Sequence, residues 1–277
     1  RIAAAIAGVR AQRAVPSLRV VVLDDLSTGF RDAVIGAELV VGNVGDRELV
    51  SRLLRDHDVD TVMHFAARTI VPESVADPLK YYHNNTAKSR ALIAAAVAGG
   101  VPHFIFSSTA ATYGIPESSP VSEDSPKAPI NPYGMSKLMT ETMLADVARA
   151  HPINFCALRY FNVAGADPRA RTGQSTAGAT HLIKVAVEAA LGKRDKVEVF
   201  GTDFATPDGT GVRDYIHVSD LANAHVLALE GLIAQGERSL IMNCGYGRGY
   251  SVLEVLDAVD RVTNQQIRRV MSPRRAG

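Results

Sequence analysis

Short apolar runs alternate with helical segments along the first 160 residues, and this alternation constrains the fold more than any other feature of the chain. Strand-like runs occupy 18–23, 60–66, 103–108 and 153–161, and apolar residues recur at helical spacing over 46–57, 77–100 and 131–150. Gly99-Gly100 provides a C-terminal cap for the second of these helices. Strands that are apolar on both faces and separated by helices are typical of a covered parallel sheet. The pattern predicts an α/β fold with a doubly wound parallel (Rossmann-like) sheet.

The composition argues against several classes of function. Thirty basic residues stand against 29 acidic ones over 277 residues, so neither a nucleic acid nor a membrane is indicated as a partner. No signal peptide and no apolar run long enough to span a bilayer is visible. The eight histidines lack metal-ligand spacing, and we assign no metal. Cys156 and Cys244 lie in apolar runs without a C-x-x-C pair, which favours reduced thiols in a cytoplasmic protein.

Asp24 ends the first strand-like run, "VVVLD". An acid at this point of a dinucleotide fold can accept hydrogen bonds from a ribose 2′-hydroxyl and repel the phosphate of NADP, so it favours NAD. Alternatively, Asp24 only begins the turn "DDLSTG". The fold also requires a glycine-rich turn roughly 20 residues earlier. Neither G-x-G-x-x-G nor G-x-x-G-x-x-G is present, and Gly8 reads as part of the following helix, so we expect the first strand and glycine loop to be missing or replaced.

The second part of the chain has a different sequence pattern. The segments 165–180 and 202–215 read as long loops, and a helix at 219–233, a strand at 239–243 and a helix at 251–263 follow. Loops of this length in a compact protein are usually functional. We expect 1–162 to form an NAD-binding domain and 163–277 to form mainly a smaller substrate-binding domain, with 212–235 packing back on the first domain.

The segment "NPYGMSK" (131–137) places a tyrosine and a lysine at the start of a helix. Asn131 is a good N-cap and Pro132 a good first helical residue. Tyr133 and Lys137 are four residues apart and so share one helix face. A nearby ammonium lowers the pKa of a tyrosine toward working pH, which suits a general base. Two solvated residues on an ordinary helix are the alternative, which the spacing alone does not exclude.

The strand before this helix ends in the hydroxyl residues Ser107, Ser108 and Thr109. A hydroxyl-ended strand followed by Y-x-x-x-K after three strand–helix units resembles the short-chain dehydrogenase/reductase superfamily in its extended form. The segments "VVVLDDLSTG", "FSSTAATYG", "LRYFNVAGADP" and above all "GTDFATPDGTGVRDYIHVSDL" resemble the UDP-glucose 4-epimerase (UDP-galactose 4-epimerase) family. The related nucleotide-sugar 4,6-dehydratases carry an acidic pair where this chain has Ala110-Ala111, which argues against dehydration.

The resemblance implies NAD-dependent epimerisation at C4 of a UDP-hexose through transient oxidation to a 4-keto sugar. Tyr133 would be the general base and then acid, Lys137 would tune it and hold the nicotinamide ribose, and Thr109 would share the sugar hydroxyl. The cofactor would also contact Asp24, Asp25, Asn43, Val44, Phe65, Ala66, Ala67, Asn85, Ser107 and Tyr160. The substrate would contact Phe161, Asn162, His181, Leu182, Phe200, Arg213 and Arg275, with both arginines on the diphosphate.

The resemblance also implies a homodimer, built from the helices at 77–100 and 131–150, whose apolar faces could equally pack within one chain. Two departures stand out: Asn43 replaces the Asp that the family usually has near the adenine, and "SPRRAG" ends the chain where the family continues. Two other functions stay open. One is a non-catalytic sugar-nucleotide-binding remnant, and the other is a UDP-uronate 4-epimerase or decarboxylase.

Overall fold

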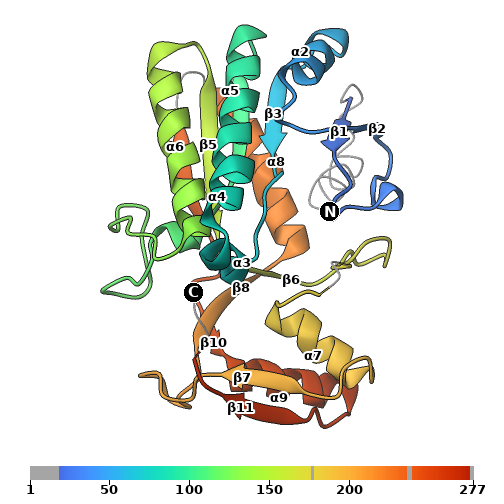
Figure 1. Cartoon of the computed structure of the whole chain (residues 1–277), viewed down its shortest axis with the longest axis vertical. Coiled ribbons are helices and arrows are strands. Elements are labelled where there is room, and N and C mark those ends of the chain that lie inside the picture. Colours follow the sequence, from blue (N-terminus) through green and yellow to red (C-terminus); the bar gives the residue numbers. More distant parts are fainter. Residues whose placement is uncertain (1–18, 176–177, 236–238, 275–277) are drawn as a thin grey trace.

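Parallel strands run through the centre of the larger part of the molecule (Figure 1). The computed structural model describes residues 19–175, 178–235 and 239–274. The central strands pair in parallel in the order β3 (Thr61–His64), β4 (His103–Thr109), β5 (Asn154–Tyr160) and β9 (Leu240–Cys244). A separate parallel pair consists of β1 (Val21–Asp24) and β2 (Glu38–Val41). The predicted α/β fold with a parallel sheet is confirmed, whereas Gly8 and the place of the expected glycine turn lie outside the described residues.

Helices cover both faces of this sheet (Figure 1). One face carries α4 (Pro78–Tyr81), a π-helical turn (Tyr82–Ala87), α5 (Lys88–Ala98) and α6 (Pro132–Ala150), with α2 (Arg47–Asp56) beside α5. The other face carries α8 (Val218–Gln235). The predicted helix 77–100 is therefore one continuous helical segment with a π-helical turn inside it. Gly100 follows α5 with a φ of 68°, which is the left-handed conformation expected of a glycine after a helix.

Successive residues of β4 are buried on opposite faces of the sheet. Phe104 and Phe106 pack in one core cluster with residues such as Leu144 of α6. Ile105 packs in a second cluster with residues such as Leu229 of α8. Because each strand is buried on both sides, its sequence is apolar throughout instead of alternating.

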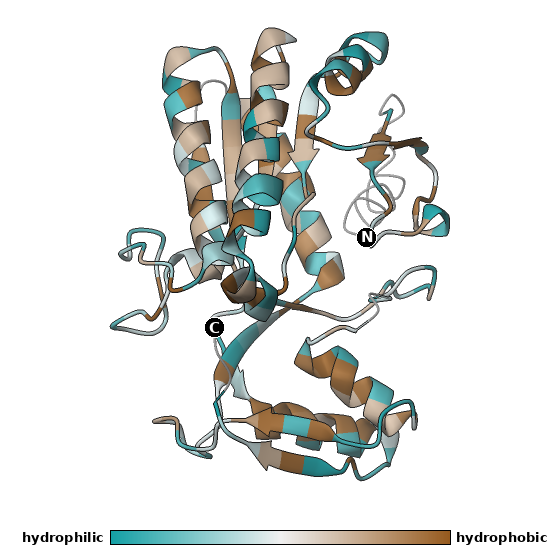
Figure 2. Cartoon of the chain, in the orientation of Figure 1, coloured by the Kyte–Doolittle hydropathy of each residue, from teal (hydrophilic) through white to brown (hydrophobic). Residues whose placement is uncertain are grey.

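The second part of the chain lies beyond the carboxyl ends of the central strands (Figure 1). Its elements are β6 (Asn162–Ala164), α7 (Leu182–Ala190), β7 (Val197–Phe200), β8 (Val212–His217), β10 (Gly249–Ser251), α9 (Val252–Thr263) and β11 (Arg269–Ser272). β8 lies between β6 and β10, and β7 pairs with β11. Hydrophobic residues along α7, β7 and α9 form a separate small core (Figure 2).

The sequence-based reading missed several of these elements. The sequence did not predict the short helix α3 (Val71–Ala76) or the elements β6, α7, β7, β10 and β11. The loop predicted over 202–215 is wrong at its end, because β8 begins at Val212. The first residues of β8 are exposed, so the strand carries polar side chains such as Arg213 and Asp214 where an apolar run was looked for. The strand is specified by its pairing with β6 and β10 and not by local hydrophobicity.

Candidate active site

A large cleft opens at the carboxyl ends of β1, β3, β4 and β5, between the central sheet and the second part of the chain. Parallel strands end on one edge, so polar residues that follow different strands converge there. The predicted site residues that line it are Asp24, Asp25, Asn43, Val44, Phe65, Ala66, Ala67, Ser107, Thr109, Tyr133, Tyr160, Phe161, Asn162, His181, Leu182, Phe200 and Arg213. Lys137 and Asn85 do not line the cleft, and Arg275 lies outside the described residues.

Tyr133 occupies the first turn of α6, next to the end of β4. The Asn131 side chain accepts a hydrogen bond from the Gly134 backbone N–H at 2.9 Å, and Pro132 is the first helical residue, which confirms the predicted helix start. Desolvation raises the pKa of Tyr133, and hydrogen bonding from the nearby Thr109 side chain partly opposes that rise. The structure thus pairs two hydroxyl groups at the edge of the sheet.

Gly134 allows α6 to start in contact with the turn that follows β4. A Cβ at this position would lie 2.6 Å from the carbonyl oxygen of Ala111, which is closer than real Cβ atoms approach backbone. The helix can therefore sit this close to Thr109 only with glycine next to Tyr133.

Gly134→Ala should lower the free energy of unfolding by about 1–3 kcal/mol, because the helix start must move away from the turn. Urea denaturation measures this change. Gly231→Ala is the matched control: Gly231 lies inside α8, and a Cβ there meets nothing within 4 Å. That variant should gain up to about 1 kcal/mol from helix propensity. Equal stabilities for the two variants would contradict the close contact at Gly134.

Lys137 lies behind the wall of the cleft. Its side chain is 3% exposed, its Nζ donates to the Ser107 carbonyl oxygen at 2.8 Å, and the same atom lies 4.9 Å from the centroid of the Phe106 ring. Burial lowers the pKa of Lys137 to about 7, and the Glu141 carboxylate opposes this shift. In the free protein the net pKa of Tyr133 is raised, because desolvation dominates; that Lys137 lowers this pKa stays a prediction.

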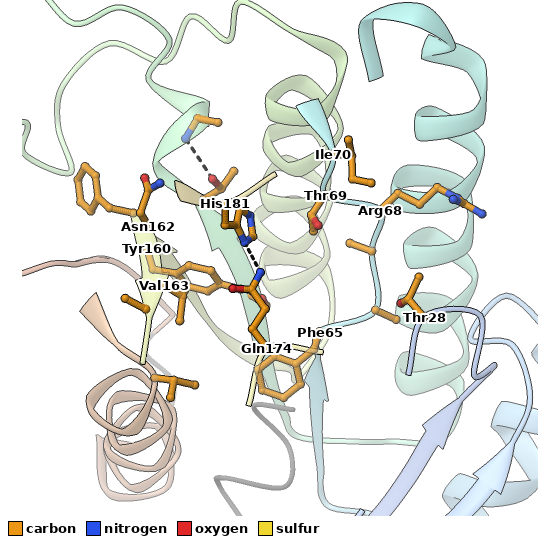
Figure 3. A pocket seen from close by; sticks show the side chains of 18 of the residues that line it. Thr28, Phe65, Arg68, Thr69, Ile70, Tyr160, Asn162, Val163, Gln174 and His181 are labelled. Atoms are coloured by element: carbon orange, nitrogen blue, oxygen red, sulfur yellow. Dashed lines mark hydrogen bonds between the residues drawn. The ribbon is translucent and has the colours of Figure 1, made fainter. Parts of the chain in front are cut away.

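Ser107 and Tyr160 hydrogen-bond each other through their hydroxyl groups. Burial raises the pKa of Tyr160, and the neighbouring Tyr133 adds to the rise, so the Tyr160 phenol stays neutral at ordinary pH. Figure 3 shows Tyr160 in the cleft beside Asn162 and Val163, on the segment that leaves β5. The Ser107 and Tyr160 hydroxyl groups therefore line the cleft near Tyr133.

Asn85 supports the cleft from behind. It lies in the π-helical turn and is 2% exposed. Its Oδ1 accepts from the Arg68 backbone N–H at 2.8 Å, and its Nδ2 donates to the Arg68 carbonyl at 3.0 Å and to Ser136 at 3.1 Å. Asn85 therefore fixes the segment after β3, which presents Phe65, Ala66 and Ala67 to the cleft.

The carboxyl end of β1 carries the acidic residues of the site. Asp24 Oδ1 accepts from the Leu26 backbone N–H at 2.7 Å, and Asp25 accepts from the Asn43 side-chain amide at 3.2 Å. Hydrogen bonding to Ser27 lowers the pKa of Asp25. Both carboxylates are therefore fixed in direction at the edge of the cleft.

Some lining residues were not singled out from the sequence. The Gln174 side-chain amide Nε2 donates to His181 Nδ1 at 2.6 Å, and both side chains lie in the cleft (Figure 3). Thr28 and Arg68 also line it. The signals available were the loop 165–180, which contains Gln174, and the turn after Asp24, which contains Thr28. Neither signal identifies a particular side chain.

Two kinds of feature are absent from the described ranges. Within them, no group of three or more His, Cys, Asp or Glu residues is arranged to hold a metal ion. Within the same ranges, no helix has the length and apolar character needed to cross a membrane.

Known proteins resemble this chain over nearly its whole length. Residues 8–245 match the NAD dependent epimerase/dehydratase family. A UDP-glucose 4-epimerase of Azospirillum brasilense is 58% identical over 258 residues, which cover 93% of this chain and 74% of the relative. The crystal structure of UDP-glucose 4-epimerase from Brucella ovis in complex with NAD has a TM-score of 0.94 at 43% identity, covering 100% of this chain and 84% of that one. The enzyme from Bifidobacterium longum in complex with NAD+ and UDP has a TM-score of 0.91 at 35% identity, again covering 100% and 84%.

Proposed function

Because the chain belongs to the NAD dependent epimerase/dehydratase family, alongside the UDP-glucose 4-epimerases, we propose that it interconverts UDP-glucose and UDP-galactose by epimerisation at C4. The observation that carries the proposal is the Tyr133–Thr109 hydroxyl pair in a cleft that also contains Asp24. A proton-transfer group and an NAD-selective acid in one cleft suit a sugar oxidation.

The described residues fit a bound dinucleotide. Asp24 presents a carboxylate to the cleft at the end of β1, where a ribose diol is usually bound. A Cβ on Gly29 would lie 2.9 Å from Asp24 Oδ1, so the glycine leaves space beside this carboxylate. Phe65, Ala66 and Ala67 add an apolar wall that suits flat rings. We assign the adenosine ribose to Asp24 and Asp25, and the adenine to the neighbourhood of Asn43 and Val44.

Tyr133 is proposed as the group that moves the proton. Bound NAD would supply reversible hydride acceptance at the sugar carbon. Tyr133 takes the proton of the 4-hydroxyl as a base and returns it as an acid, and Thr109 hydrogen-bonds the same oxygen. The pKa of Tyr133 is raised by burial in the free protein, so a cation beside it is needed to bring that pKa down. A positive nicotinamide ring and a protonated Lys137 both act in this direction.

The substrate is proposed to extend from Tyr133 toward the second part of the chain. Arg213 lines this side of the cleft, and a guanidinium suits a diphosphate. Phe161, Asn162, His181, Leu182 and Phe200 line the same region, with His181 tied to Gln174. Rotation of the oxidised sugar about its diphosphate link would then present its other face for reduction.

The proposed domain division is 1–162 for NAD and 163–277 mainly for the substrate. It is supported by the separate core around α7, β7 and α9, and by contacts of α8 with β4 and β5, as expected for 212–235. We further propose a homodimer, for which the exposed Leu79 and Met139 on α4 and α6 provide apolar surface. A cytoplasmic place in galactose metabolism accords with the free thiols of Cys156 and Cys244.

Asp24→Asn should weaken NAD binding about tenfold and reduce discrimination against NADP, because a charged acceptor near the ribose is lost while the acceptor for Leu26 remains. Isothermal titration of both nucleotides measures the two effects. Asp32→Asn is the matched control, since Asp32 is an exposed acid that does not line the cleft. Unchanged cofactor preference in Asp24→Asn would count against the ribose assignment.

The proposed activity is tested by incubating the protein with NAD and UDP-glucose and quantifying UDP-galactose. UDP-glucuronate is supplied in parallel as a second substrate. Turnover of the uronate alone would favour the uronate epimerase or decarboxylase. Nucleotide binding by a folded protein without any turnover would instead favour a non-catalytic remnant.

A further inference from the structure

A buried ion pair joins α6 to the ends of β4 and β5. Arg159 of β5 is 1% exposed and Glu141 of α6 is 2% exposed. Arg159 Nη2 lies 2.5 Å from Glu141 Oε2, and Arg159 Nε lies 3.0 Å from Oε1. Ser108 of β4 donates a hydrogen bond to the same carboxylate. The carboxylate is therefore bound by two elements of the sheet at once.

This ion pair lies directly behind the proposed catalytic residues. Three consecutive residues of β4 each contact one side chain of α6. Ser107 accepts from Lys137 through its carbonyl, Ser108 donates to Glu141, and the Thr109 side chain lies near Tyr133 and lowers its pKa. Glu141 follows Lys137 by four residues on the same helix face. In the sheet, Ser108 pairs with Arg159 and Thr109 with Tyr160.

Arg159 also holds several residues of the cleft in place through hydrogen bonds. Its Nη1 donates to the Tyr113 hydroxyl at 2.9 Å, and that hydroxyl donates to the Asn243 side chain at 2.7 Å. Asn243 in turn donates to the Val121 carbonyl at 3.1 Å. Tyr113, Val121 and Asn243 all line the cleft. One guanidinium thus connects α6, β4, β9 and the loop after β4.

A buried ion pair is not an effective way to stabilise a fold. Replacing such a pair by apolar side chains of similar volume is often neutral or stabilising, because two charges no longer have to be desolvated. The electrostatic surroundings of Lys137 suggest another use. His64 of β3 faces Lys137 but is neutral, since burial lowers its pKa to about 3. Tyr133 is also neutral, which leaves Glu141 as the anion acting on Lys137 in the described part of the chain.

We propose that Glu141, held in place by Arg159 and Ser108, is a positioning residue that favours the cationic form of Lys137 and fixes it, with Tyr133, against the end of β4. The charge of Lys137 is a property of the protein by itself. Only the consequence for turnover rests on the proposed epimerase function.

The test follows the titration of Lys137 by NMR of the protein labelled with ¹³C at lysine Cε, with the signal assigned by its loss in Lys137→Arg. The neutral variant Glu141→Gln/Arg159→Met removes both charges. Its Lys137 midpoint should fall by about one pH unit, because the stabilising carboxylate is gone. Ser108→Ala is the matched control: it removes one hydrogen bond to Glu141 and keeps both charges, so the midpoint should stay within about 0.3 units.

Turnover provides the second readout. In the neutral variant, kcat should fall about tenfold at pH 8 and recover as the pH is lowered to 6, where Lys137 regains its proton. The amide variant Glu141→Gln/Arg159→Gln repeats both measurements with hydrogen-bonding side chains if the first variant does not fold. An unchanged Lys137 midpoint in either folded variant overturns the proposal. A shifted midpoint in a protein without epimerase activity would support it and reject the proposed function.

Discussion

Tyr133→Phe should lower kcat for UDP-glucose epimerisation by about 10³-fold, since it removes the group that takes and returns the sugar proton. The structure places Tyr133 near Thr109 and near the hydrogen-bonded pair Ser107 and Tyr160. Neither Thr109 nor Tyr160 is expected to replace it, because a threonine hydroxyl is a poor base and the Tyr160 hydroxyl is hydrogen-bonded to Ser107. Initial rates at saturating substrate measure the loss.

Binding of UDP separates this effect from misfolding. Tyr133→Phe removes one oxygen and little volume, so the Kd for UDP should change less than about twofold. Tyr250→Phe is the matched control, because Tyr250 of β10 does not line the cleft, and its rate should match the unmodified protein. If Tyr133→Phe retained most of its activity, the proposed proton transfer would be wrong.

Lys137→Met should make the nucleotide-free protein more stable at pH 7 while lowering kcat by about 10²-fold or more. The folded-state pKa of Lys137 is about 7, against 10.5 for an ordinary lysine. Below pH 7 both states carry the proton, and the folded state bears the full cost of burying the charge. Between pH 7 and 10.5 the folded state loses that proton first, so the cost declines as the pH rises.

Urea denaturation at pH 7 and pH 9.5 measures this linkage. Lys137→Met should raise the free energy of unfolding by about 1–3 kcal/mol at pH 7, a net value that already includes loss of the hydrogen bond to the Ser107 carbonyl. This gain should be smaller at pH 9.5. A loss of stability at pH 7, or a gain independent of pH, would contradict a buried lysine with a lowered pKa. The expected outcome is a residue that costs stability and is retained for catalysis.

Local signals were sufficient to predict β3, β4, β5 and the start of α6, but not that β9 joins the same sheet. The strands β4 and β5 are buried on both faces and β3 is partly buried, so their apolar runs were visible in the sequence. Asn131 and Pro132 specify the first turn of α6 by backbone hydrogen bonding and fixed φ, both of which are local. That Thr109 and Tyr133 act on the same sugar hydroxyl was implied by the family resemblance, and the structure places both residues in the cleft.

Properties that depend on residues distant in the sequence could not be predicted from local signals. The direction of Lys137 is determined by the Ser107 carbonyl, and its pKa by burial, which helix spacing does not reveal. Arg159 looked like a polar interruption in an apolar strand, because its partner Glu141 is 18 residues away. β8 is specified by pairing with β6 and β10, and its exposed first residues carried no strand signal.

The central claim is that C4 of the sugar is oxidised and reduced within one cleft. Its most direct test supplies UDP-glucose labelled with deuterium at C4, together with NAD, and locates the label in the product by NMR and mass spectrometry. The account predicts UDP-galactose with the deuterium retained at C4, because the hydrogen removed is the one returned. A failure to form UDP-galactose, or a product whose C4 hydrogen comes from solvent, would contradict it.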